Sequence, residues 1–132
     1  MAGLTRLSLL LKAMKPKLQK GEWVFCCVPE KKFSRIKIKP LLTFKEKEGV
    51  TLIIEKKMAK ANSLHYSESW SLITLQVHSS LTAVGFLALI TNRLAKEGIS
   101  INVISAHYHD HLFVPSGKAK KAIGILKRLS RT

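Results

Sequence analysis

The chain has 132 residues, of which 46% are hydrophobic and 23% charged, and its formal net charge is +15 at pH 7. This length fits one compact domain or two very small ones. The composition excludes a disordered basic tail, which would lack the apolar residues that a core requires. It also excludes a membrane-spanning helix, because no stretch approaches about 18 uninterrupted apolar residues.

The positive charge is distributed unevenly along the chain. Residues 1–66 carry a net charge of +10 and residues 67–132 carry +5, with the densest basic stretch at residues 31–39. A surplus of this size attracts polyanions over long range but does not specify a fold. It therefore supports two hypotheses, a nucleic-acid-binding module and a basic protein that binds an anionic small ligand.

The N-terminal region is predicted to form an amphipathic helix that ends before Pro16. Leucines and a methionine recur there at helical spacing, at positions 4, 7, 10, 11 and 14. The apolar block between Arg6 and Lys12 is too short for a secretory signal peptide. We therefore interpret this region as part of the fold.

The two cysteines, Cys26 and Cys27, are adjacent, which fits neither a disulfide framework nor a Cys-x-x-Cys metal site. They lie in an apolar run, so we expect both to be buried, reduced thiols. Reduced cysteines indicate a reducing compartment, and the expected location is the cytoplasm.

In the first half, residues 22–28 and 50–55 are rich in β-formers and predict two buried strands. Residues 31–39 alternate lysine with apolar side chains, which is typical of an edge strand or a solvated loop. Residues 40–48 predict a short helical turn that ends at Gly49. Residues 56–62 predict a short polar helix, and residues 63–69 a connection.

In the second half, residues 70–77 predict a strand, followed by a helix that Ser79 or Ser80 caps and that runs to Glu97. Residues 99–106 predict another strand, and residues 111–114 a further element after a turn near residues 109–110. Residues 117–129 predict a basic amphipathic helix. The order strand, helix, strand, strand, helix predicts an α+β sandwich.

A histidine cluster, His107, His109, Asp110 and His111, raises the hypothesis of a metal-dependent hydrolase. The spacing lacks one residue of the dinuclear pattern His-x-His-x-Asp-His. A turn at residues 109–110 would instead place His107 opposite His111 across a hairpin. We expect a structural hairpin and no metal site.

Patterns typical of catalysis are scarce. The chain has only eight acidic residues, none paired for general acid–base chemistry, and its seven glycines form no phosphate-binding loop. We therefore expect a protein that is not an enzyme and that needs no cofactor.

The stretch most indicative of function runs from residue 77 to residue 104. A strand ends at Val77, a polar loop follows, and the expected helix start would attract an anion such as an amino-acid carboxylate. Gly85 would allow the close approach of another backbone or of a ligand, and Asn102 could add a donor and an acceptor. The alternative is purely structural: the serines cap the helix, Gly85 packs it onto the sheet, and Asn102 is solvated.

The segment from Trp70 to Leu129 resembles an ACT domain, on the stretches ITLQVHSSL, AVG and LAKEGISINVISA. The tail AHYHDHLFVPSGKAKKAIGIL resembles a family of small stand-alone bacterial ACT-like proteins. The stretches GEWVFCCVP and PLLTFKEKEGVTLIIE resemble the N-terminal region of that family. The resemblance implies an N-terminal ACT-like half, residues 1–66, and a C-terminal ACT domain, residues 67–132.

The resemblance implies a ferredoxin-like βαββαβ sandwich and a non-catalytic regulatory protein that binds an amino acid or an anionic metabolite. It also implies a homodimer formed through sheet edges or helix faces; the lack of a long apolar stretch already leads us to expect no membrane partner. Site residues carried over from the family lie on the first strand–helix loop and the second strand. They are His78, Ser79, Ser80, Leu81, Val84, Gly85, Asn102, Val103 and Ile104.

Two features depart from the family pattern. The loop HSSLTAVG lacks the Asp or Asn and the Pro-Gly pair that many amino-acid-binding members carry, and so has no acid to hold an ammonium group. The sequence also ends three residues after Leu129, without a closing strand. We therefore expect the fourth strand to come from the first half or from another subunit, with the two halves interlocked.

Overall fold

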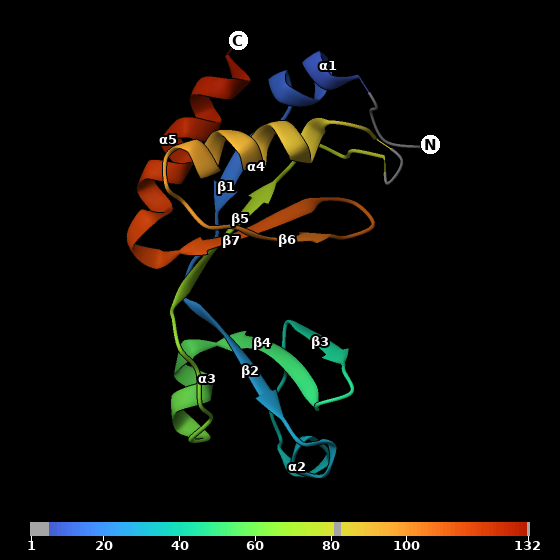
Figure 1. The fold of residues 1–132 in the computed structure, drawn as a ribbon, viewed down its shortest axis with the longest axis vertical. Helices are drawn as coiled ribbons and strands as arrows, with labels where there is room; N and C mark the ends of the chain where they lie inside the picture. Colours follow the sequence, from blue (N-terminus) through green and yellow to red (C-terminus); the bar gives the residue numbers. More distant parts are fainter. Residues whose placement is uncertain (1–5, 81–82, 132) are drawn as a thin grey trace. The chain divides into compact units, whose positions relative to one another are not determined.

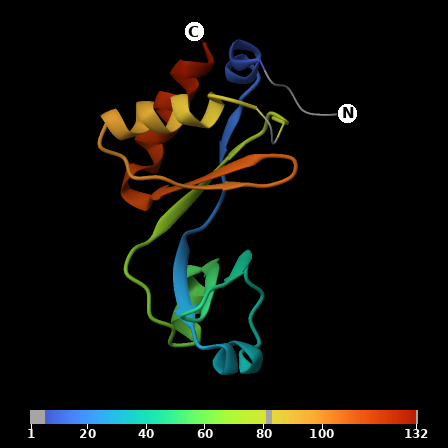
Figure 2. The same ribbon diagram turned by 45° about the vertical axis from the view of Figure 1, so that its right-hand side comes forward.

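The computed structural model describes residues 6–80 and 83–131, and the chain forms two compact units. The inserted unit comprises residues 21–70, and the discontinuous unit comprises residues 1–20 and 71–132. The blue N-terminal segment and the orange and red C-terminal segments thus belong to one unit (Figures 1 and 2). The boundaries of these units differ from those of the expected halves, 1–66 and 67–132, because residues 6–20 pack with elements of the second half.

The sheet of the discontinuous unit has the strand order β1-β5-β7-β6. The strands are β1 (Pro16–Leu18), β5 (Trp70–Leu75), β6 (Asn102–Ser105) and β7 (Asp110–Pro115). The short strand β1 pairs antiparallel with β5, placing Lys17 opposite Thr74. β1 occupies the place of the closing strand in a ferredoxin-like sheet, so the expected interlocking of the two halves is confirmed.

Three helices of the discontinuous unit share a core with this sheet: α1 (Leu7–Lys12), α4 (Phe86–Lys96) and α5 (Ala119–Ser130). A 3₁₀ turn, η1 (Ser116–Lys118), leads into α5. The expected N-terminal helix is present, and Leu10, Leu11 and Met14 are buried. The predicted position Leu4 lies outside the described residues. Alternate side chains of β5 and β7 complete the core: Ile73, Leu75, Leu112 and Val114.

In the inserted unit the strands pair in the order β3-β4-β2. Its elements are β2 (Trp23–Val28), α2 (Glu30–Arg35), β3 (Leu42–Lys45), β4 (Val50–Glu55) and α3 (Lys56–Ala61). Trp70, the first residue of β5, pairs with Trp23 on the other side of β2. This unit therefore repeats the ferredoxin-like strand order. Its core consists of Val24, Cys26, Val28, Val50, Leu52, Ile54, Ala59 and Leu64.

Two expectations for the first half were wrong. Residues 30–35 form the helix α2, where an edge strand or a solvated loop was expected, because the extended Pro29 precedes charged residues that tolerate a helix. Residues 36–40 do form a loop. Residues 42–45 form the edge strand β3, not a helical turn. Thr43 and Phe44 are β-formers, and pairing with β4 outweighs the helical preference of the lysines that follow.

Two boundaries in the second half also differ from the prediction. Helix α4 begins at Phe86, several residues later than a serine cap would place it. The β6–β7 turn spans residues 106–109, where the backbone N–H of Ala106 donates to the carbonyl of His109 at 3.0 Å. Consequently His111 pairs with Ile104, not with His107.

The cysteines lie on opposite faces of β2. Cys26 is buried and Cys27 is exposed, so the expectation that both are buried was wrong for Cys27. Neighbouring residues of a strand point to opposite faces, and only one of the pair can enter the core. Burial raises the pKa of the Cys26 thiol.

None of the helices in residues 6–80 and 83–131 is long and apolar enough to cross a membrane.

Candidate functional site

A cavity of about 120 Å³ lies at the N-terminal end of α4, in the discontinuous unit. The yellow start of α4 and the chain leading into it are visible in Figure 2. Three of the predicted site residues, Ser79, Ser80 and Gly85, line this cavity. The other lining residues are Ala83, Phe86, Leu87, Ala88, Ser105 and Asp110.

Asp110 supplies a buried carboxylate to the cavity. Its side chain is only 6% exposed, and its Oδ2 accepts a hydrogen bond of 2.9 Å from Ser79 Oγ. Asp110 opens β7 opposite Ser105, so both side chains lie on the sheet face that the helices cover. The fold thus brings an acid to the loop that lacks one in the sequence.

The start of α4 forms another wall of the cavity. Gly85 is the N-cap residue, and its carbonyl accepts the backbone N–H of Leu89 at 3.0 Å. No side chain of the described residues caps this helix. The first N–H groups of a helix have no intrahelical partner, and here Phe86, Leu87 and Ala88 carry them. A bound anion could accept hydrogen bonds from these groups.

Gly85 contributes backbone conformation, not space. Its φ is +88°, in the left-handed region that glycine adopts readily. A Cβ at this position would meet nothing within 4 Å, so the expected close approach within the chain is not present.

The remaining predicted site residues do not line the cavity. His78 packs beside the tip of the β6–β7 turn, with its ring centroid 5.4 Å from that of Tyr108. Val84 is 86% exposed. Leu81 lies outside the described residues. Three predicted residues of β6 also lie outside the cavity, although Ser105 at the end of this strand lines it. Asn102 and Ile104 face the other side of the sheet, and Val103 lies two residues farther along the strand than Ser105.

Sequence reasoning missed Ser105 and Asp110, and it placed the anion-attracting helix start several residues too early. Asp110 is the only aspartate of the chain, and it follows a histidine-rich turn. This context drew attention to metal binding, and only strand pairing reveals that its side chain faces Ser79. A single acid among apolar strand residues was the available signal.

The histidine cluster forms a line of rings along the β6–β7 turn. His107 and Tyr108 have centroids 4.8 Å apart, and His109 and His111 6.2 Å apart. Among the residues that the structure describes, no three or more His, Cys, Asp or Glu are arranged to hold a metal ion. Burial lowers the pKa of His111, and the charge of His109 lowers it further, while Asp110 opposes both effects.

Two family models match the chain, and both are described as an ACT domain. One matches residues 2–71 and the other residues 67–128. A comparison with curated proteins found no match. ACT domains are typically regulatory modules that bind small molecules.

Solved structures share the fold. A Vibrio cholerae protein of unknown function, described as a possible transport protein, is 44% identical, with a TM-score of 0.85 over 94% of this chain and 95% of that one. A protein from Agrobacterium tumefaciens is 17% identical, with a TM-score of 0.71 over 89% of each chain.

The regulatory subunit of aspartate kinase from Thermus thermophilus is 10% identical, with a TM-score of 0.67 over 89% of this chain and 98% of that one. At these lower identities the likeness concerns the fold alone. Together, the two matched models span residues 2–128, and this chain belongs to the ACT-domain family, of which it carries two copies in tandem.

Proposed function

We propose that this protein is a non-catalytic regulatory module that binds a free amino acid in the cavity at the start of α4. One observation supports the proposal above the others. A buried carboxylate, Asp110, and an uncapped helix N-terminus line the same small cavity. The two ends of an amino-acid zwitterion need these two kinds of group.

The helix start is suited to the α-carboxylate. The N–H groups of residues 86–88 have no intrahelical acceptor, and the helix dipole adds a partial positive charge at this end. The hydroxyl groups of Ser79 and Ser80 line the cavity beside them. An amino-acid carboxylate placed here would accept hydrogen bonds from these N–H groups, which no side chain of the described residues accepts.

Asp110 is suited to the ammonium group. Asp110 is only 6% exposed, and burying a polar group costs free energy unless it has hydrogen-bond partners. Ser79 supplies one such hydrogen bond. A ligand ammonium would add a charge-assisted hydrogen bond and a compensating positive charge. The loop itself has no acid, but the fold provides one from β7.

Cavity size and charge narrow the ligand class. A volume of about 120 Å³ lies well below the roughly 300 Å³ at which pockets for drug-sized ligands begin. This favours a small amino acid. A metabolite that is only anionic would be repelled by Asp110, so the amino acid is the preferred ligand of the two classes.

Isothermal titration of the full-length protein against the twenty amino acids tests this function. We expect at least one small amino acid to bind, and its N-acetyl and carboxamide derivatives to bind much more weakly, because each loses one charged end. If none of the twenty amino acids binds to the folded protein, the proposal is contradicted. Equal binding of the N-acetyl derivative would contradict the role of Asp110.

We further propose that the protein is a homodimer that pairs through β6. This strand is the last in the order β1-β5-β7-β6, so its outer edge has no partner strand in the described residues.

The nucleic-acid alternative gains no support from the fold. Phe33, the one aromatic residue of the dense basic stretch, packs against the core of the inserted unit and does not present its ring for base stacking.

A further inference from the structure

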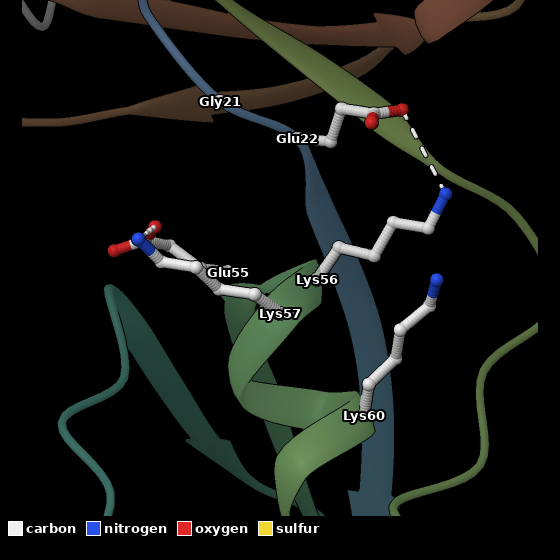
Figure 3. A pocket seen from close by; sticks show the side chains of 6 residues that line it. All are labelled: Gly21, Glu22, Glu55, Lys56, Lys57 and Lys60. Carbon is white, nitrogen blue, oxygen red and sulfur yellow. Dashed lines mark ion pairs between the residues drawn. The ribbon is translucent and has the colours of Figure 1, made fainter.

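A second pocket, of about 340 Å³, lies within the inserted unit, remote in sequence from the start of α4. Figure 3 shows the six residues that line it. Two come from the segment that leads into β2, and four from the end of β4 and from α3. They are Gly21, Glu22, Glu55, Lys56, Lys57 and Lys60.

The three lysines of this pocket are not equivalent. Lys56 and Lys60 are four residues apart on α3, so they lie on the same face of the helix. Figure 3 shows both side chains extending to the same side of the helix. Lys57 points the other way, where its Nζ lies 3.4 Å from Glu55 Oε2. In this pocket, Lys57 therefore has an acidic partner, Glu55, whereas Lys56 and Lys60 form a pair of like charges.

The carboxylate of Glu22 lies near this pair of lysines. Glu22 Oε1 is 3.9 Å from Lys56 Nζ, at the long end of an ion pair, and it also accepts a hydrogen bond from Ser69 Oγ. Among the described residues, the ammonium group of Lys60 has no ion-pair partner within 4.0 Å. Lys56 and Lys60 thus leave an unbalanced positive charge beside an open pocket.

We infer that this pocket binds the phosphate group of a small phosphorylated metabolite, between the ammonium groups of Lys56 and Lys60. A phosphate group carries the negative charge that would balance the ammonium groups of Lys56 and Lys60. Lysine commonly binds phosphate as a point charge. No arginine lines the pocket to form the planar fork that suits a carboxylate. The volume exceeds the needs of a lone phosphate and falls within the range of small-ligand sites.

Glu22 competes with the ligand for Lys56. A phosphate that enters the pocket lies near this carboxylate, which repels it and at the same time neutralises part of the charge that attracts it. Removing the charge of Glu22 should therefore strengthen phosphate binding, whereas removing Lys60 should weaken it. A nonspecific effect of the net charge cannot distinguish Lys60 from Lys57, because each substitution lowers the net charge equally.

The test is a titration of ¹⁵N-labelled full-length protein with glycerol 3-phosphate, followed by NMR at constant ionic strength. Glycerol alone is the control for the phosphate group. We expect saturable shifts concentrated at Gly21, Glu22 and residues 55–60. The variant Lys60→Met should weaken binding about tenfold, as expected for loss of a hydrogen bond between charged groups.

The matched control is Lys57→Met, which should change affinity by less than about twofold because Glu55 already neutralises this lysine. Glu22→Gln should tighten binding by about two- to fivefold. Equal losses in the Lys57 and Lys60 variants, shifts spread over lysines of the whole chain, or no saturation would each overturn the assignment. Since this pocket and the α4 cavity share no residue, failure here leaves the amino-acid proposal intact.

Discussion

Gly85 sets the backbone direction with which the chain enters α4. Its φ of +88° is unfavourable for any residue with a Cβ, although the space around it is open. We predict that Gly85→Ala lowers the free energy of unfolding by about 1–2 kcal/mol, which urea denaturation would measure. Gly124→Ala is the control. Gly124 lies inside α5, where a Cβ would meet nothing within 4 Å, so alanine there should stabilise the helix by about 0.5–1 kcal/mol.

An equal effect of the two alanine substitutions would contradict this interpretation. It would mean that the left-handed conformation at Gly85 carries no cost and that another residue could begin the helix there.

His111 connects stability to pH. Its Nδ1 lies 3.0 Å from Thr74 Oγ1, and its pKa is lowered from 6.5, chiefly by burial. Well above pH 6.5 the ring is neutral in both the folded and unfolded states. Below it, the unfolded chain binds the proton more readily, so acidification lowers the free energy of unfolding. We predict that the wild-type protein loses more stability than His111→Gln between pH 7.5 and pH 5.5, as measured by urea unfolding at each pH.

Parallel losses in the two proteins would show that the other histidines account for the pH dependence. In that case the contact between His111 and Thr74 would have no measurable effect on protonation.

At the scale of elements, α1 and β1 complete the fold of the second half. Leu10, Leu11 and Met14 are buried in the core of the discontinuous unit, and β1 provides its closing strand. Burial of each such side chain contributes about 1.5–3 kcal/mol, so their loss approaches the total stability of a small domain, about 5–15 kcal/mol. We predict that a fragment of residues 67–132 does not unfold cooperatively on heating or in urea.

The control for the fragment restores the missing elements. A permuted chain that joins residues 70–132 through a short linker to residues 6–20 contains all the described elements of the discontinuous unit and should unfold cooperatively. Cooperative unfolding of the shorter fragment, at a similar midpoint, would contradict the requirement for β1.

Sequence patterns predicted the elements that local physics determines. Dense β-formers identified β2, β4 and β5, and helical spacing identified α1 and α5. The errors lie where pairing decides the outcome. Edge strand β3 depends on pairing with β4, and α2 forms in a stretch whose alternating lysines were typical of an edge strand or a loop. The late start of α4 depends on the φ of Gly85, which no residue pattern reveals.

The candidate site was predictable in part for the same reason. Ser79, Ser80 and Gly85 lie on the loop whose strand–loop–helix pattern is readable from the sequence. Asp110 is 31 residues away from Ser79 and reaches it only because β7 lies beside β5. The three β6 residues were expected at the site from family resemblance, but only the end of β6, at Ser105, lines the cavity.

At the scale of the whole molecule, the two ACT units differ in the chemistry they present. The discontinuous unit has a small cavity with one buried acid and an uncapped helix start. The inserted unit has a larger pocket lined by three lysines. The net charge of +15 therefore does not by itself identify a ligand, because the cavity proposed for the amino acid contains an acid and no lysine or arginine.

The central claim is that a zwitterionic amino acid binds between Asp110 and the start of α4. An NMR titration of ¹⁵N-labelled protein with the tightest-binding amino acid, on the wild type and on Asp110→Asn, tests it most directly. The account predicts large shifts of the Phe86, Leu87 and Ala88 amides in the wild type, and affinity at least about tenfold weaker in the variant. Undiminished affinity in Asp110→Asn, or shifts that avoid residues 86–88, would contradict it.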